Sequence, residues 1–239
     1  APQLQGGNDE ACDLIVAAIE QAGYRPGEDI AIALDPAASS FYEAGRYRLT
    51  RSGQGDKTAA EMVALFESWV AKYPIVSIED GHAENDWAGF AAMTAALGAR
   101  VQIVGDDLLV TNPRYIARAV AEKACTAALI KLNQIGTVSE TVEAIHLCRK
   151  AGWGFVISHG RDRGPVHRRL RRRDGRRPDQ DRVAVPVRAH RQVQPPARDR
   201  GAAWQRGGVR RLSIAGMTTR PRIPTAVWAL GFVSLGLTP

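Results

Sequence analysis

Five polar side chains stand where short, largely apolar runs of this sequence end: Asp35, Glu79, Asp106, Lys131 and His159. Three of them are carboxylates, and carboxylate oxygens are the ligands that Mg²⁺ prefers in proteins. A neighbouring positive charge lowers the pKa of a lysine, so that it can act as a base near neutral pH. Carboxylates, a hard cation and a lysine together are suited to removing a proton next to a substrate carboxylate.

The segments between these residues predict the framework that brings them together. Each apolar run reads as a buried parallel strand, and an amphipathic helical pattern separates one run from the next. The helices are expected to start at Asn8, at the Thr58–Glu61 capping box, at Asp86, at Asn112-Pro113 and at Thr137 or Ser139. The first helix is expected to end at Gly23 and to bury Leu14, Ile15, Ala18, Ile19 and Ala22. The segment from Tyr42 to Leu49 reads as a small surface excursion.

Five alternations of strand and helix predict an α/β fold with a parallel sheet, of the TIM-like barrel type. In such a barrel the carboxyl ends of all strands meet at one rim, so the five polar residues are expected to lie there together. Any one of them alone could be a solvated charge at the end of a strand. Five in series favour a functional site over that alternative.

The net charge of +7 describes neither half of the chain. Residues 1–159 hold 13 Lys and Arg against 20 Asp and Glu, whereas residues 160–239 hold 19 Arg and 5 Asp with no Lys or Glu. The chain is therefore divided into a globular part, residues 1–159, and an Arg-rich region of low order, residues 160–239. That basic region could bind nucleic acid or another polyanion through phosphate contacts.

Cysteine content and hydropathy indicate a cytoplasmic protein without a membrane segment. Cys12, Cys125 and Cys148 are odd in number and far apart, which argues against a disulfide framework or a zinc site of paired cysteines. No secretory signal opens the sequence. The apolar stretch Ile223–Leu237 contains Pro224, and its 15 residues are fewer than the roughly 20 needed to span a bilayer.

Residues 1–159 resemble enolase (phosphopyruvate hydratase), and the resemblance rests on motifs around the polar strand ends. The motifs are Ile32-Ala33-Leu34-Asp35, Ser77-Ile78-Glu79-Asp80-Gly81, Val104-Gly105-Asp106-Asp107-Leu108, Ile130-Lys131-Leu132-Asn133-Gln134-Ile135-Gly136-Thr137 and Val156-Ile157-Ser158-His159. The run after Lys131 favours enolase itself over the racemases and cycloisomerases of its superfamily. A metal ion paired with a lysine base is the established pattern of this superfamily.

The resemblance implies a role for each polar strand end. Asp35, Glu79 and Asp106 would bind Mg²⁺, Lys131 would take the C2 proton of 2-phosphoglycerate, and His159 would contact the substrate. Loss of water would then give phosphoenolpyruvate, a step of glycolysis. The intact enzyme would be a homo-oligomer, as is usual in the family.

The sequence departs from the family pattern directly after His159. Enolases continue with Arg-Ser-Gly-Glu-Thr-Glu-Asp and later contain Gly-Gln-Ile-Lys-Thr-Gly, which supply a phosphate-binding arginine and serine and a second lysine. When these segments are written in GC-rich codons, a shift of two bases yields Arg161 to Gly164 and Pro178 to Arg182. The family segment Arg-Ile-Ala-Lys-Tyr-Asn-Gln likewise yields His190 to Pro195. We interpret residues 160–239 as frameshifted translation.

This interpretation predicts a chain that is incomplete as an enolase. About five of the eight barrel strands would be present, and two unpaired strand edges and several apolar faces would meet water. We therefore expect the chain alone to be poorly stable and inactive. The alternative is a non-catalytic basic protein that binds nucleic acid or other polyanions through residues 160–211.

Overall fold

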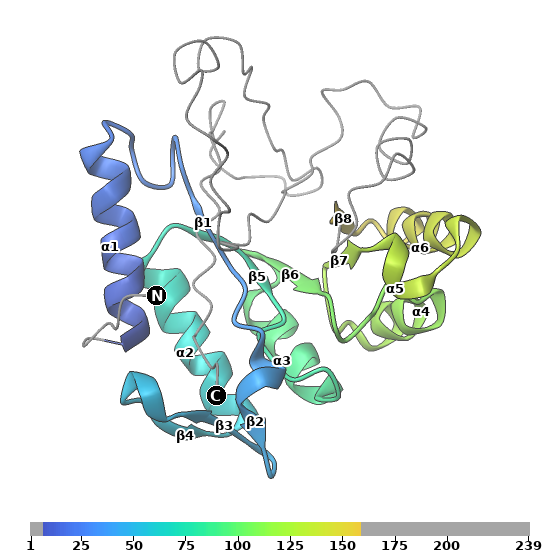
Figure 1. The fold of residues 1–239 in the computed structure, drawn as a ribbon, viewed down its shortest axis with the longest axis horizontal. Coiled ribbons are helices and arrows are strands. Elements are labelled where there is room, and N and C mark those ends of the chain that lie inside the picture. Colours follow the sequence, from blue (N-terminus) through green and yellow to red (C-terminus); the bar gives the residue numbers. More distant parts are fainter. Residues whose placement is uncertain (1–6, 159–239) are drawn as a thin grey trace, which may run out of the picture.

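The computed structural model describes residues 7–158 of the chain (Figure 1). Its centre is a five-stranded parallel sheet in the order β1-β5-β6-β7-β8. The strands are β1 (Ile32–Leu34), β5 (Ile75–Glu79), β6 (Gln102–Gly105), β7 (Ala127–Ile130) and β8 (Gly154–Ile157). Neighbours in the sheet follow one another along the chain, which is the order of a barrel. The predicted α/β fold, part of a TIM-like barrel, is confirmed.

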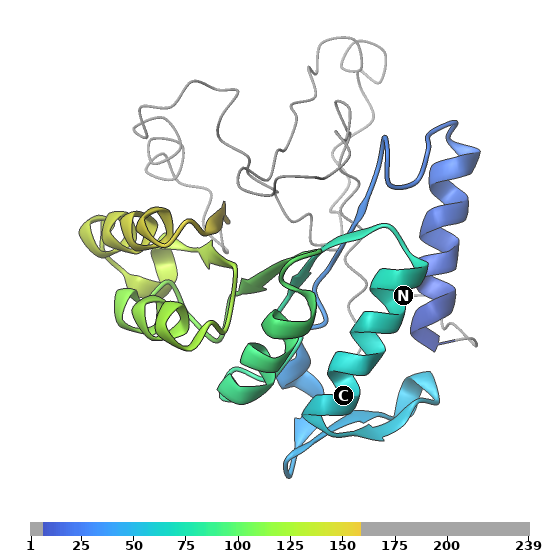
Figure 2. The ribbon, with the colours of Figure 1, turned by 180° about the vertical axis from the view of Figure 1, so that it is seen from behind.

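Helices connect the strands and cover one face of the sheet (Figures 1 and 2). The helices are α1 (Gly7–Gln21), α2 (Ala59–Lys72), α3 (Trp87–Leu97), α4 (Pro113–Glu122), α5 (Leu132–Ile135) and α6 (Val138–Lys150). Helix α2 contacts β5, α3 contacts β6, and α6 contacts both β7 and β8. None of the helices described between residues 7 and 158 is long and apolar enough to cross a membrane.

Side chains alternate between two buried layers along the central strands. Ile103, Ala128 and Ile130 belong to the main core, where they join Phe66 and Phe90 of the covering helices. Val104, Ala127, Leu129 and Val156 form a second buried cluster. Since successive side chains of a strand point to opposite faces, the second cluster lies on the face turned away from the helices.

Most predicted helix starts are confirmed by their capping hydrogen bonds. Thr58 and Glu61 form the capping box of α2. The side chains of Asp86, Asn112 and Thr137 accept hydrogen bonds from backbone N–H groups at the starts of α3, α4 and α6. Thr137, rather than Ser139, is therefore the cap of α6.

The prediction for the first helix is partly wrong. Asn8 lies within α1 instead of capping it, and its Nδ2 donates a hydrogen bond to Oε1 of Gln54 at 3.0 Å. Leu14, expected in the core, is 53% exposed. The buried stripe is instead formed by Cys12 and Ile19, with Ile15 half-buried, so it is rotated relative to the expected one.

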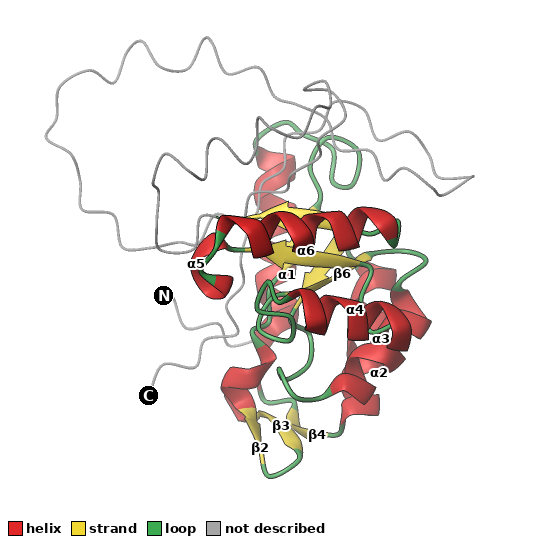
Figure 3. Cartoon of the chain, turned by 90° about the vertical axis from the view of Figure 1, so that its right-hand side faces the viewer, coloured by secondary structure: helices red, strands yellow, loops and turns green. Residues whose placement is uncertain are grey.

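The segment after β1 is a folded element and not a simple surface excursion. It contains η1 (Ala38–Phe41) and η2 (Thr50–Ser52) and a small antiparallel sheet, visible at the lower edge of the molecule in Figure 3. The three strands are β2 (Tyr42–Glu43), β3 (Arg46–Leu49) and β4 (Gly55–Lys57). Tyr47 of β3 is fully buried and reaches Asp86 at the start of α3.

Candidate functional site

Four of the five predicted site residues lie at the carboxyl ends of adjacent parallel strands. Asp35 directly follows β1, Glu79 ends β5, Asp106 directly follows β6 and Lys131 directly follows β7. The fifth, His159, lies outside the described residues. The three carboxylate residues are all buried, with exposed fractions of 9% for Asp35, 8% for Glu79 and 3% for Asp106.

The electrostatics of Glu79 show that these four side chains interact. The pKa of Glu79 is raised well above its usual range, first by burial and then by the negative charges of Asp35 and Asp106. Lys131 acts in the opposite direction and lowers that pKa. Carboxylate oxygens are the donors that a hard divalent cation prefers. The buried negative charges around Glu79 outnumber the single positive charge of Lys131, so a cation would be attracted to them. The donor set therefore fits a divalent metal ion.

Lys131 is held by contacts at both of its ends. Its Nζ forms an ion pair with Oδ2 of Asp106, and its side chain is only 13% exposed. Its backbone N–H donates to Oγ1 of Thr111 at 2.8 Å. Gln134, one helical turn further on in α5, donates from Nε2 to Oδ1 of Asp106 at 3.0 Å.

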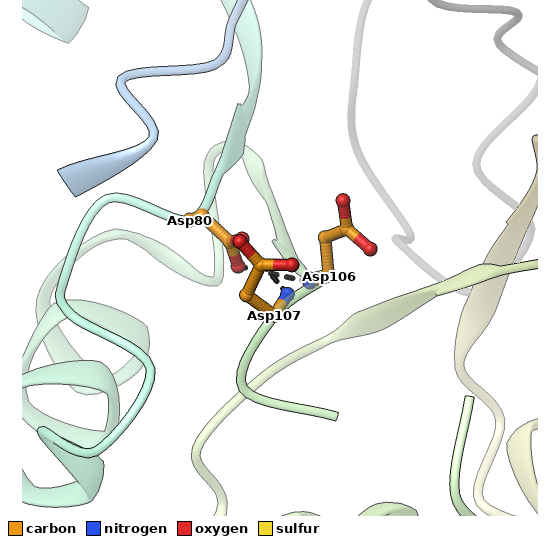
Figure 4. Close-up of side chains that lie close together, drawn as sticks. All are labelled: Asp80, Asp106 and Asp107. Carbon is orange, nitrogen blue, oxygen red and sulfur yellow. Dashed lines mark hydrogen bonds between the residues drawn. The ribbon is translucent and has the colours of Figure 1, made fainter. Parts of the chain in front are cut away.

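Asp80 is a buried carboxylate of this site that the sequence reasoning passed over. Its Oδ1 and Oδ2 accept hydrogen bonds from the backbone N–H groups of Asp106 and Asp107, each at 2.9 Å (Figure 4). Burial, followed by the charge of Asp106, raises the pKa of Asp80 well above its usual range. The sequence signal was present, because Asp80 directly follows Glu79 at the same strand end.

The three neighbouring aspartates Asp80, Asp106 and Asp107 could also be read as a metal cluster, since one carboxylate oxygen of each lies within 4.8 Å of the others. Figure 4 shows, however, that the carboxylate of Asp106 points away from the other two. Both oxygens of Asp80 are already engaged by backbone N–H groups. Through these two hydrogen bonds Asp80 holds the end of β6 in place.

Comparison with known sequences identifies the family. The family model described as "Enolase, C-terminal TIM barrel domain" matches residues 1–164. The chain belongs to the enolase family. Enolase 1 of Methylococcus capsulatus is 77% identical to it over 159 residues, which are 66% of this chain and 38% of that protein. Enolase of Desulfotalea psychrophila is 56% identical over 161 residues, again 66% of this chain and 38% of that protein.

The matches cover about two thirds of this chain and a smaller share of each relative. Enolase 2 of Methanospirillum hungatei is 57% identical over 152 residues, covering 64% of this chain and 35% of that protein. The chain thus spans a little over a third of the length of the enolases it matches. All four described site residues lie inside the part that matches the enolase family model.

Proposed function

We propose that residues 1–159 carry the metal-binding and base part of an enolase active site, which catalyses the reversible, Mg²⁺-dependent dehydration of 2-phosphoglycerate to phosphoenolpyruvate. The observation that carries this proposal is the contact of Lys131 with Asp106, on neighbouring strand ends that also present Glu79 and Asp35. Membership of the enolase family supports the choice of reaction.

Each residue has a distinct part in the proposed reaction. Asp35, Glu79 and Asp106 would hold Mg²⁺, which when bound supplies positive charge beside the substrate carboxylate. Lys131 accepts the proton from C2 of 2-phosphoglycerate at its Nζ. The C3 hydroxyl group takes up a second proton, from a general acid or from solvent, and leaves as water, while the electron pair of the former C2–H bond forms the C2–C3 double bond of phosphoenolpyruvate. His159, outside the described residues, is proposed to contact the substrate.

We further propose that a polypeptide of these 239 residues alone lacks turnover. Within residues 7–158, β1 and β8 each pair with only one neighbouring strand, whereas a closed barrel has no edge. Residues 160–239 are proposed to form a separate region produced by a shifted reading frame. The setting we propose for the intact enzyme is cytoplasmic and homo-oligomeric.

A chimeric enolase that contains residues 1–159 of this chain tests the proposed function. Residues 1–159 would replace the matching segment of Enolase 1 of Methylococcus capsulatus, which is 77% identical over this stretch. We expect the chimera to form phosphoenolpyruvate in the presence of Mg²⁺, and expect Asp106→Asn or Glu79→Gln to abolish that activity. Asp107→Asn, at the exposed neighbouring carboxylate, is the matched control and is expected to remain active. A folded chimera without turnover would contradict the proposal.

A second candidate function follows from the charge of residues 160–239, which carry 19 Arg against 5 Asp. Such a segment attracts polyanions through phosphate contacts, and this attraction weakens with salt. We expect the 239-residue chain to be retained on heparin at low salt. A chain ending at His159 should pass through, and equal retention of the two chains would refute this role.

A further inference from the structure

Thr111 occupies a backbone conformation that its side chain does not favour. It has a φ of 59°, and the preceding Val110 has a φ of 40°, although both are β-branched residues. Left-handed conformations are costly for such residues and persist only where the surroundings fix them. Thr111 is also fully buried. The fold therefore holds its hydroxyl group in a defined place.

The hydroxyl of Thr111 joins two elements of the candidate site. Its Oγ1 accepts a hydrogen bond from the backbone N–H of Lys131 at 2.8 Å. The same oxygen lies 2.9 Å from Oε1 of Gln134, which has no proton to donate, so the hydroxyl proton of Thr111 points to Gln134. A longer contact of 3.4 Å to the carbonyl oxygen of Leu129 is the other acceptor in reach.

Gln134 continues the connection to the carboxylate that pairs with the lysine. Its Nε2 donates to Oδ1 of Asp106 at 3.0 Å, and Oδ2 of the same carboxylate meets Nζ of Lys131. If the oxygen and nitrogen of the Gln134 amide were exchanged, the amide oxygen would face Asp106. The hydrogen bond to that carboxylate would then be lost. The contacts thus close a ring that starts at the backbone of Lys131 and returns to its side chain.

We propose that Thr111 and Gln134 are positioning residues, which fix the rotation of the Asp106 carboxylate and the direction of Lys131. The inference rests on the proposed function, because it assigns a purpose to that site's own hydrogen bonds. Gln134 is suited to this role since its amide can accept from a hydroxyl and donate to a carboxylate at once. Neither residue touches the substrate in this account.

Partners of ligating carboxylates typically change metal affinity about 10- to 100-fold when they are removed. The test is therefore the dissociation constant of Mn²⁺, used alone as the probe and followed by electron paramagnetic resonance on the full 239-residue chain. We expect Gln134→Ala and Thr111→Val to weaken Mn²⁺ binding by about that factor. Thr111→Ser, which keeps the hydroxyl group, should restore nearly the original affinity.

Controls separate positioning from general damage. Asn133→Ala removes an exposed amide next to Gln134 and should leave Mn²⁺ binding unchanged. Gln134 is only half-buried, so its variant remains informative if Thr111→Val does not fold. Unchanged thermal unfolding with weakened Mn²⁺ binding supports positioning, whereas equal affinity in Gln134→Ala and the unaltered chain overturns it.

The failure of this inference can be told apart from failure of the proposed function. If Asp106→Asn and Glu79→Gln abolish Mn²⁺ binding but Gln134→Ala and Thr111→Val do not alter it, the positioning role is wrong and the metal site stands. If the unaltered chain does not bind Mn²⁺, or if Asp106→Asn binds it equally well, the proposed site is wrong and the positioning role falls with it.

Discussion

At the scale of a single residue, Asp80 shows how one buried carboxylate fixes the backbone of a strand end in the candidate site. The residue is 4% exposed, and its carboxylate caps two consecutive backbone N–H groups of the strand end that carries Asp106. It also adopts a left-handed conformation with a φ of 44°, which asparagine and aspartate tolerate better than most residues.

The first prediction is therefore made for Asp80→Asn. The amide NH₂ would face a backbone N–H that has lost its acceptor, and a buried unsatisfied donor costs about 1–3 kcal/mol of unfolding free energy. Urea denaturation should show this loss. Asp107→Asn, at an exposed side chain, should stay within about 0.5 kcal/mol of the unaltered chain. Equal stability of the two variants would show that Asp80 does not hold the strand end.

His82 is a second buried polar residue, and the aromatic rings of Tyr47, Phe66 and Phe90 surround it. Its Nε2 lies 3.2 Å from the carbonyl oxygen of Ala59, and its Nδ1 has no hydrogen-bond partner among the described residues. Burial lowers the pKa of His82 below its ordinary value of 6.5, against smaller opposing effects of the Ala59 carbonyl and of Asp86.

The second prediction follows from the lowered pKa of His82. Because the folded state binds the proton of His82 less readily than the unfolded state, its contribution to stability is present above about pH 6.5 and is lost as the pH falls below it. Between about pH 7.5 and about pH 5.5 the loss amounts to about 1.4 kcal/mol at most. Urea denaturation of His82→Phe should show a pH dependence that is weaker by up to that amount, and an unchanged dependence would contradict a neutral buried histidine.

At the scale of elements, the side chain of Tyr47 connects the small antiparallel sheet to the start of α3. The hydroxyl of Tyr47 in β3 donates to Oδ2 of Asp86 at 2.6 Å and accepts from the backbone N–H of Ala83 at 3.0 Å. Burial, followed by the hydrogen bond to Asp86, raises the pKa of Tyr47 far above its ordinary value. The hydroxyl therefore stays protonated and can donate to the cap of α3.

The third prediction is a loss of about 1–3 kcal/mol of unfolding free energy in Tyr47→Phe, since the buried N–H of Ala83 would lose its acceptor. Chemical denaturation measures this loss. Tyr24→Phe, at a side chain that is 45% exposed, is the matched control and should be nearly neutral. A Tyr47→Phe chain as stable as the Tyr24→Phe chain would mean that the hydroxyl does not anchor the sheet.

The elements also show which parts of the structure could be predicted from sequence. The caps at Thr58, Asp86 and Asn112 depend on residues within one helical turn, so their local patterns were sufficient. The burial of Tyr47 and the contact of Asn8 with Gln54 depend on partners 39 and 46 residues away, which local patterns do not specify.

The candidate site was likewise predictable from the sequence only in part. The four charged strand ends from Asp35 to Lys131 were predictable because parallel strands deliver their carboxyl ends to one rim. The supporting contacts of Thr111, Gln134 and Asp80 were not, since each depends on how two loops approach one another. The strand-end positions of the candidate site residues were therefore easier to predict from the sequence than the contacts that support them.

At the scale of the whole molecule, the three free cysteines report on the integrity of the core. All are buried, and burial raises the pKa of Cys12 to about 11 and that of Cys148 to about 12. Burial also raises the pKa of Cys125 well above its ordinary value. A thiol reagent reacts with the thiolate form. Burial therefore protects these side chains in two ways, because it blocks access and keeps the thiols protonated.

The fourth prediction is that a colorimetric disulfide reagent at about pH 8 labels the folded chain at least about 100-fold more slowly than the chain in denaturant, where all three thiols react. Cys12→Ser should lower the number of thiols labelled in denaturant by one and leave the slow native rate unchanged. Rapid labelling of the chain in the absence of denaturant would show that this partial barrel does not keep its core closed.

Lys131 is proposed to be the base that removes the C2 proton of 2-phosphoglycerate, and the decisive measurement is the exchange of that proton with solvent. Nuclear magnetic resonance can follow deuterium incorporation at C2 of 2-phosphoglycerate in D₂O, using the chimera that carries residues 1–159. We expect exchange in the unaltered chimera and an exchange rate lower by about 10²- to 10⁴-fold in Lys131→Met. Exchange at an equal rate in the folded Lys131→Met chimera would contradict it.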